Sequence, residues 1–133
     1  MTPEQTATAQ ACHAGATQGR MTFPAILATL IANGFDGYLV DLRHGTARYY
    51  LTDGDSTDCP GPAETVALDF DAAALQSAIR AAQTGAPGYT YAGFCHQAAQ
   101  AGCAGYLVSL PGRRVLYFGR SGETHVEHFP ATI

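Results

Sequence analysis

The sequence predicts an α+β fold in which two tandem α-α-β-β(-β) repeats form one antiparallel sheet, with the helices packed mainly on one face. Two observations predict it. The chain aligns with itself at an offset of 68 residues, and each copy has two helical stretches followed by short alternating strands. Because 133 residues is the size of one domain, we expect a single domain over 1–133. Its parts are repeat 1 at about 1–60, a linker at 60–66 and repeat 2 at about 67–133.

The internal repeat covers segments 22–55 and 90–123, which align without a gap. The two copies share a Gly-x-x-Gly-Tyr-Leu-Val block, which chance similarity of helix–turn–strand patterns does not readily produce. We therefore interpret the similarity as a duplication. The identical positions are Thr22/Thr90, Gly34/Gly102, Gly37/Gly105, Tyr38/Tyr106, Leu39/Leu107, Val40/Val108, Leu42/Leu110, Tyr49/Tyr117 and Gly54/Gly122.

Each copy predicts two helices with recognisable ends. Asp71 can cap the first helix of repeat 2 and Gly85 can end it. Gly34 and Gly102 should end the second helices, because glycine accepts a left-handed backbone without strain. The expected helices span about 3–17 and 23–33 in repeat 1, and about 70–84 and 91–101 in repeat 2.

Each helix pair is followed by a predicted hairpin and a weaker third strand. Tight turns are expected at His44-Gly45 and Gly112-Arg113, and further turns at Asp53-Gly54 and Ser121-Gly122. The expected strands span about 37–43, 46–52 and 55–59 in repeat 1, and about 105–110, 114–120 and 123–129 in repeat 2.

Period-two alternation assigns the two faces of each strand. With two-residue turns, Val40 lies opposite Tyr49 and Asp41 opposite Arg48; the first pair should lie under the helices and the second in solvent. Further predicted pairs are Tyr38–Leu51, Leu42–Ala47 and Leu39–Tyr50. The helix-facing residues of repeat 2 are expected to be Tyr106, Val108, Leu110, Val115, Tyr117 and Val126. Its open face should carry Leu107, Ser109, Arg114, Leu116, Phe118, Arg120, Glu123, His125, Glu127 and Phe129.

The candidate site lies on this open face, near the polar stretch 119–130. His125 and Glu127 would share a strand face, as general acid–base chemistry or metal binding requires; His125 and His128 would not. The alternative is a solvated strand in which Arg120 pairs with Glu123 across the turn. Arg113 and Arg114 could bind a phosphate or carboxylate, or serve solubility alone. The candidate ligand- or partner-binding residues are Arg114, Leu116, Phe118, Arg120, Glu123, His125 and Glu127.

Composition and motifs exclude several classes of protein. With a net charge of −4, seven Arg and no Lys, the chain has too few cations for a nucleic-acid partner. Because it shows no long apolar run and no leader pattern, we expect no membrane partner and a cytoplasmic location. The four cysteines, at 12, 59, 95 and 103, form no Cys-x-x-Cys motif, so we expect free, buried thiols. No phosphate-binding or nucleophile-elbow motif occurs, and no catalytic residue, cofactor or metal is indicated.

Several blocks of the sequence resemble the YdfO-like family, a bacterial and prophage-encoded family of unknown function that is often labelled "phage envelope protein". The resemblance implies an α+β fold and occurrence in bacterial or prophage genomes, and it implies no catalytic residue. The blocks are Met21-Thr22-Phe23-Pro24, Gly37-Tyr38-x-x-Asp41-Leu42, Tyr49-Tyr50-Leu51-x-Asp53-Gly54, Gly112-Arg113-Arg114-x-x-Tyr117-Phe118-Gly119-Arg120-x-Gly122-Glu123 and Glu127-x-Phe129-Pro130.

Two functions stay open at this point. In the first, the protein is a binding or interaction module whose open sheet face contacts another protein or a second copy of itself. Its basis is the apolar cluster of Leu107, Leu116 and Phe118. In the second, Arg120, His125 and Glu127 bind a small anionic molecule, with His125 as the base if the protein is an enzyme. We favour the first; whether the chain is an enzyme stays undecided.

Overall fold

The computed structural model describes residues 1–131, and both copies have the element order α-α-β-β-β. The predicted α+β fold and the placement of the helices on one face of the sheet are therefore confirmed. Repeat 1 comprises α1 (Pro3–Thr17), α2 (Phe23–Ala32), β1 (Phe35–Asp41), β2 (Thr46–Leu51) and β3 (Ser56–Pro60). Repeat 2 comprises α3 (Ala72–Thr84), α4 (Tyr91–Gln100), β4 (Cys103–Ser109), β5 (Arg114–Gly119) and β6 (Thr124–His128).

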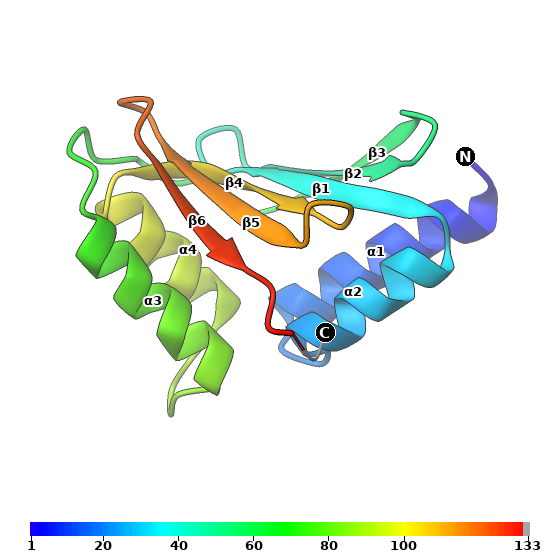
Figure 1. The fold of residues 1–133 in the computed structure, drawn as a ribbon, viewed down its shortest axis with the longest axis horizontal. Coiled ribbons are helices and arrows are strands. Elements are labelled where there is room, and N and C mark those ends of the chain that lie inside the picture. Colours follow the sequence, from blue (N-terminus) through cyan, green and yellow to red (C-terminus); the bar gives the residue numbers. More distant parts are fainter. Residues whose placement is uncertain (132–133) are drawn as a thin grey trace.

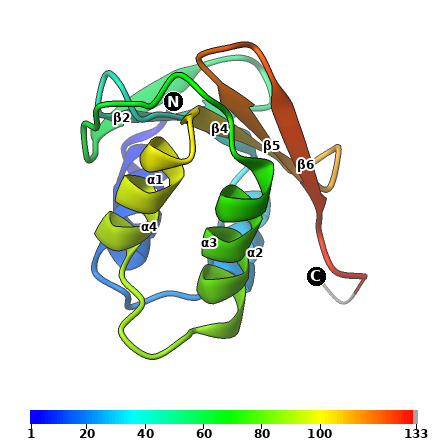
Figure 2. The ribbon, with the colours of Figure 1, turned by 90° about the vertical axis from the view of Figure 1, so that its left-hand side faces the viewer.

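The six strands form one antiparallel sheet in the order β3-β2-β1-β4-β5-β6. The two repeats therefore meet at the centre, where β1 pairs with β4, and each repeat supplies one half of the sheet. All four helices lie below the sheet (Figure 1), α1 and α2 under one half and α3 and α4 under the other. The end-on view shows the same two layers, with no helix over the upper face of the sheet (Figure 2).

The repeated threonines and glycines mark the ends of corresponding helices. The Thr22 and Thr90 hydroxyls accept hydrogen bonds from backbone N–H groups in the first turns of α2 and α4, at 3.3 and 3.0 Å. Gly34 and Gly102 have φ of 83° and 88° directly after these helices, as predicted. Asp71 caps α3 through the N–H of Ala74, so that prediction is also confirmed.

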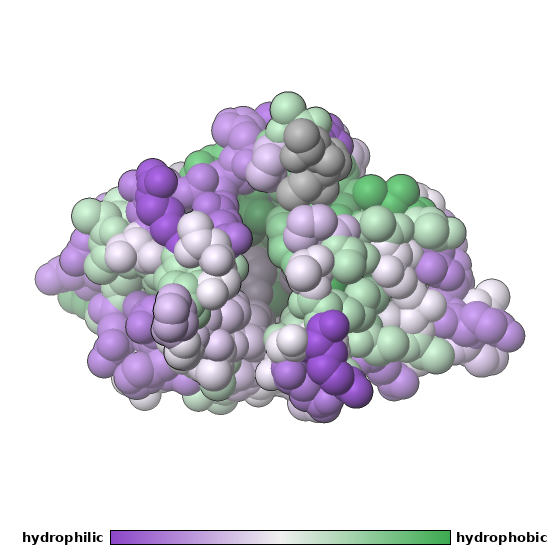
Figure 3. Space-filling model, turned by 90° about the horizontal axis from the view of Figure 1, so that it is seen from below, coloured by the Kyte–Doolittle hydropathy of each residue, from purple (hydrophilic) through white to green (hydrophobic). Residues whose placement is uncertain are grey.

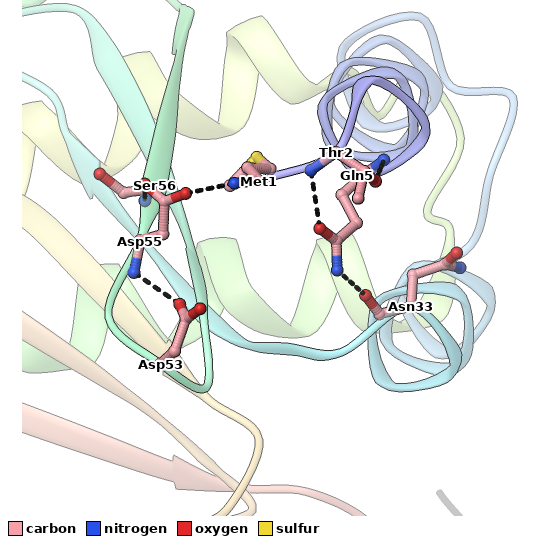
Figure 4. Close-up of polar contacts among 7 residues, drawn as sticks. All are labelled: Met1, Thr2, Gln5, Asn33, Asp53, Asp55 and Ser56. Carbon is pink, nitrogen blue, oxygen red and sulfur yellow. Dashed lines mark hydrogen bonds and ion pairs between the residues drawn. The ribbon is translucent and has the colours of Figure 1, made fainter.

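The start of α1 is tied to both neighbouring parts of repeat 1 (Figure 4). Thr2 and Gln5 form a reciprocal capping box. The Gln5 side-chain nitrogen also donates to the carbonyl of Asn33 at the end of α2. The ammonium group of Met1 pairs with Asp55 in the turn between β2 and β3. These contacts fix α1 against both α2 and the outer hairpin.

The first hairpin has a longer turn than predicted, and its register differs accordingly. Residues 42–45 form the turn between β1 and β2, so Val40 lies opposite Ala47 and Tyr38 opposite Tyr49. All five pairs predicted for this hairpin, Asp41–Arg48 among them, are therefore wrong. Asp41 instead accepts the N–H groups of Arg43 and His44 within the turn, which stabilises the four-residue form. Because the register shifts by two residues, every side chain keeps its predicted face.

The turn in repeat 2 has the same length, and Ser109 accepts the Gly112 N–H where Asp41 accepts its counterpart. Both turns need a left-handed residue at the same place. Repeat 1 supplies Gly45 with φ of 79°, and repeat 2 supplies Arg113 with φ of 51°. Arg113 is therefore the one non-glycine residue with a positive φ in the part of the chain described.

Two glycines allow β1 and β4 to pair at the centre of the sheet. A Cβ atom on Gly37 would lie 2.1 Å from the carbonyl oxygen of Val108. A Cβ atom on Gly105 would lie 2.3 Å from the carbonyl oxygen of Val40. Gly37 and Gly105 are equivalent in the duplication, and so are Val40 and Val108. The same close approach therefore occurs twice, once from each repeat.

We predict that Gly105→Ala lowers the free energy of unfolding by at least about 2–3 kcal/mol, because the added methyl group must push β1 and β4 apart. Gly61→Ala is the control, since its nearest atom would lie 3.8 Å away, and it should change stability by less than about 0.5 kcal/mol. Urea denaturation followed by circular dichroism measures both. Equal stability of the two variants would contradict the steric role of this glycine.

Candidate functional site

The uncovered face of the sheet carries an apolar stripe that runs across both repeats. The register places Leu39 opposite Leu107, Leu107 opposite Leu116, and Leu116 opposite Val126. We call these four side chains the aliphatic row. Leu107 and Val126 are 38% and 37% exposed, and the other two are half-buried. Neighbouring strands lie about 4.8 Å apart, so the row extends over roughly 14 Å.

Polar groups border the aliphatic row. At its repeat 1 end, the next residues across the sheet are Arg48 and Asp58, joined by two hydrogen bonds of 2.7 and 3.0 Å. This ion pair lowers the pKa of the Asp58 carboxyl. Arg114 and His128 lie opposite each other along one side of the row. The face is therefore an apolar stripe with a charged surround.

Phe118 lies on the same face but is partly covered. Its ring lies against Gly105 and packs on a small buried cluster that includes Val66 and Ala104. Val66 belongs to the linker between the repeats. The linker therefore covers one end of this face and leaves the aliphatic row free.

The predicted face of β6 is wrong, because the loop before it has an odd number of residues. Phe118 pairs with Thr124, and the Gly119 N–H donates to the Glu123 carbonyl, so the three residues 120–122 form the loop. A two-residue turn would have paired Arg120 with Glu123, so the observed register differs by an odd number and reverses the faces. Val126 therefore lies on the open face, while His125, Glu127 and Phe129 lie on the helix side.

The seven candidate residues are consequently divided among three places. Arg114, Leu116 and Phe118 lie on the open face. Arg120 leaves the sheet to donate to the carbonyl of Val66 at 3.0 Å, and Glu123 accepts from Ser121 within the turn. His125 and Glu127 lie together under β6. The predicted Arg120–Glu123 pair is absent from the ion pairs of residues 1–131.

His125 and Glu127 form a pair beneath the outer strand of repeat 2. The Nε2 atom of His125 lies 3.0 Å from a carboxylate oxygen of Glu127, and both side chains are about one-quarter exposed. The imidazole ring lies against Tyr117, with ring centroids 6.3 Å apart. The pair is thus open to water on one side and borders the aromatic core on the other.

Five tyrosines line the interior beneath the sheet and near the start of α4. Burial raises the pKa values of Tyr38, Tyr49, Tyr106 and Tyr117 well above the usual value for a phenol. Burial also raises the pKa of Tyr91, which lies in α4 with its hydroxyl 2.7 Å from that of Tyr106. These phenols therefore stay protonated in the folded chain.

The histidines next to cysteines have partners of their own. The two ring nitrogens of His13 lie 2.7 Å from the Pro60 carbonyl and 3.4 Å from the Tyr49 hydroxyl. His13 faces a groove of about 550 Å³ between α1 and β3. His96 contacts Glu64 on the surface. All four cysteines are free and buried, as predicted, and burial raises the pKa of the Cys95 thiol to about 11.

Residues 1–131 contain no cluster of three or more His, Cys, Asp or Glu side chains arranged to hold a metal ion. Among the helices described, none has the length and apolar character needed to cross a membrane.

A family model described as "Protein of unknown function (DUF1398)" matches residues 10–127. The chain belongs to this family. The match extends from the middle of α1 almost to the end of β6, so it includes both repeats and both faces of the sheet. A comparison with curated proteins finds no match. The family description assigns no activity, and the site has to be interpreted from its geometry.

The buried phenols predict a loss of stability at alkaline pH. Because their pKa values are raised in the folded state, they contribute stability below the ordinary phenol pKa of about 10 and lose it as the pH rises further. Each such phenol should lower the free energy of unfolding by about 1.4 kcal/mol for every pH unit above that value. Urea midpoints between pH 9 and 11 test this, and Tyr117→Phe should give a shallower fall than wild type. An equal fall would contradict the burial of this phenol.

Proposed function

We propose that this protein is a small binding module that uses the open sheet face, and that its partner there is a second copy of the chain. The observation that carries the proposal is the aliphatic row of Leu39, Leu107, Leu116 and Val126. Exposed apolar stripes with polar borders are typical of protein contacts. Antiparallel sheets often leave one face to solvent, but that face is then usually polar.

A second copy suits this surface because every side chain of the row is aliphatic, so the row has the same chemical character along its length. Two such rows can pack against each other as the inner faces of a β-sandwich do, at a sheet separation of about 10 Å. A two-fold axis places identical patches opposite each other, so a self-complementary apolar stripe needs no other partner surface. The charges at its border, Arg48, Asp58 and Arg114, would stay at the solvated rim.

The alternative function, a small anionic ligand held by Arg120, His125 and Glu127, has less support. Arg120 is bound to the linker carbonyl of Val66, whereas the other two residues lie under β6. We also propose a cytoplasmic location, in agreement with four cysteines that are buried without forming disulfides.

Light scattering after size-exclusion chromatography tests the dimer. From about 1 µM to about 1 mM, the mass of the wild-type protein should rise from one chain to two. Leu107→Glu places a charge in the middle of the aliphatic row and should weaken association by at least ~10-fold. Ile31→Glu is the matched control, because Ile31 is 59% exposed but lies on α2; it should dimerise like wild type.

Either of two results would overturn the dimer proposal. One is a monomer at every concentration. The other is an equal loss of association in Leu107→Glu and Ile31→Glu, because it would show that any added charge on the surface prevents self-association.

A further inference from the structure

Within residues 1–131, the sheet ends in two edge strands, β3 in repeat 1 and β6 in repeat 2. The outer backbone N–H and C=O groups of an edge strand can pair with a strand of another chain, so proteins usually block such edges. Figure 2 shows β6 at the margin of the sheet, with none of the described helices beyond it. Seen from below, the helix side has strongly hydrophobic residues in only a few places (Figure 3). Besides the open face, the edges are therefore the parts of the molecule best suited to contact another chain.

Every second residue of β6 turns its backbone groups away from β5. At one end of the ladder the Gly119 N–H donates to the Glu123 carbonyl, and at the other the Phe129 N–H donates to the Arg113 carbonyl, both at 2.8 Å. Because hydrogen-bonded pairs alternate along an antiparallel ladder, the even-numbered residues of β6 turn outward. These are Thr124, Val126 and His128. No hydrogen bond to their outer N–H or C=O groups occurs within residues 1–131.

The equivalent edge of repeat 1 is blocked. The same alternation in the β2–β3 ladder turns Ser56, Asp58 and Pro60 outward. Pro60 has no N–H group, and its carbonyl lies 2.7 Å from the Nε2 atom of His13 in α1. The Ser56 N–H donates to the side chain of Asp55 at 2.9 Å. Another strand would therefore find few free backbone groups on β3.

Repeat 2 lacks the groups that block β3. At the offset of 68 residues between the repeats, Pro60 corresponds to His128, and His13 corresponds to Ala81. His128 has an N–H group to donate, and an alanine side chain cannot bond to a carbonyl. The duplication therefore has one blocked edge and one open edge, and the open edge is β6.

The five residues of β6 are complementary to a second β6 strand. When two copies pair antiparallel about Val126, the strands overlap fully, and the outward groups form two hydrogen bonds at each pair. Val126 then lies opposite the partner's Val126, and Thr124 opposite the partner's His128. On the helix side, His125 lies opposite the partner's Glu127, at a pair without backbone hydrogen bonds, where side chains come closest.

This arrangement keeps the contact that already exists within each chain. The Nε2 atom of His125 lies 3.0 Å from the carboxylate of its own Glu127, and a protonated imidazole has a second N–H to donate. The partner's Glu127 supplies an acceptor for it, so bases and acids alternate across the junction. On the open face, the two Val126 side chains continue the aliphatic row from one copy into the other. Both faces of the strand therefore match.

We propose that β6 is an edge-pairing site, and that its partner is the β6 strand of a second copy of the chain, antiparallel and centred on Val126. The contact joins two sheets side by side into one. It uses the edge of the sheet, whereas the dimer proposed above uses the open face, so neither contact depends on the other. Because the ladder is short, the edge contact is the weaker of the two, with a dissociation constant above about 1 mM.

Disulfide trapping tests the contact and its register. His125→Cys and Glu127→Cys are mixed at about 0.1 mM in a glutathione redox buffer, and covalent dimer is measured on a non-reducing gel. The new thiols of the two variants lie opposite each other in the proposed register. Two thiols at the same position lie diagonally, about 7–8 Å apart, which is too far for a disulfide. The mixture should therefore give at least ~5-fold more covalent dimer than either variant alone.

Three further variants separate edge pairing from other contacts; the four native cysteines are buried and should not react. His128→Pro copies the residue that blocks β3, and it removes an outward N–H without affecting the β5 ladder. Added to both cysteine variants, it should lower cross-linking several-fold with unchanged circular dichroism. Leu107→Glu, which disrupts only the open face, should leave cross-linking unchanged. Thr57→Cys, at the place on β3 equivalent to His125, should give no covalent dimer when mixed with Glu127→Cys.

The edge-pairing proposal is overturned if no covalent dimer forms, or if each cysteine variant alone cross-links as well as the mixture. It is also overturned if His128→Pro has no effect, or if Thr57→Cys cross-links like His125→Cys. Loss of cross-linking in Leu107→Glu would overturn it as well, because the β6 strands would then meet only through the open face. Light scattering of Leu107→Glu tests the face dimer separately, so either contact can fail without the other.

Discussion

The pairing of β1 with β4 is the constraint on which the rest of this structure depends. It joins the two repeats into one sheet, and it requires that Gly37 and Gly105 carry no Cβ atom, because the carbonyl groups of Val108 and Val40 occupy that space. The helices lie on the same side of the sheet because β1 and β4 pair with their helix-facing residues on the same face: Tyr38 lies opposite Val108, and Val40 opposite Tyr106. The aliphatic row crosses it on the open face, so this surface does not exist in a single repeat.

Much of the fold follows from the sequence because its local determinants are short-range. The duplication, the Asp71 cap of α3 and the glycines that end α2 and α4 need only neighbouring residues to act. Hairpin register is harder to predict from the sequence, because turn length depends on side chains such as Asp41 that form hydrogen bonds within the turn. A shift of two residues preserved the faces of β2, whereas an odd shift reversed those of β6 and moved His125 to the helix side.

The candidate site was harder to predict than the fold, because it depends on which strands are neighbours. Nothing local indicates that Leu39 of repeat 1 lies beside Leu107 of repeat 2, or that Tyr38 contacts Tyr106. The sequence correctly marked Leu107, Leu116 and Phe118 as residues of an apolar face. It missed the other half of the row, and it correctly placed the buried tyrosines on the helix side.

The duplication also indicates which residues serve the scaffold and which serve a function. The identical pair Gly37/Gly105 maintains the junction, and the identical pair Gly34/Gly102 ends α2 and α4. On the open face, Arg48 and Asp58 of repeat 1 correspond to Leu116 and Val126 of repeat 2. Arg48 and Asp58 bond to each other as an ion pair, whereas Leu116 and Val126 leave apolar surface uncovered. On the helix side repeat 2 is the more polar copy, since Thr57 and Cys59 of repeat 1 correspond to His125 and Glu127 of repeat 2. Repeat 2 therefore carries both departures from a self-contained sheet, an apolar one above and a charged one below, and both include residues of the strand β6.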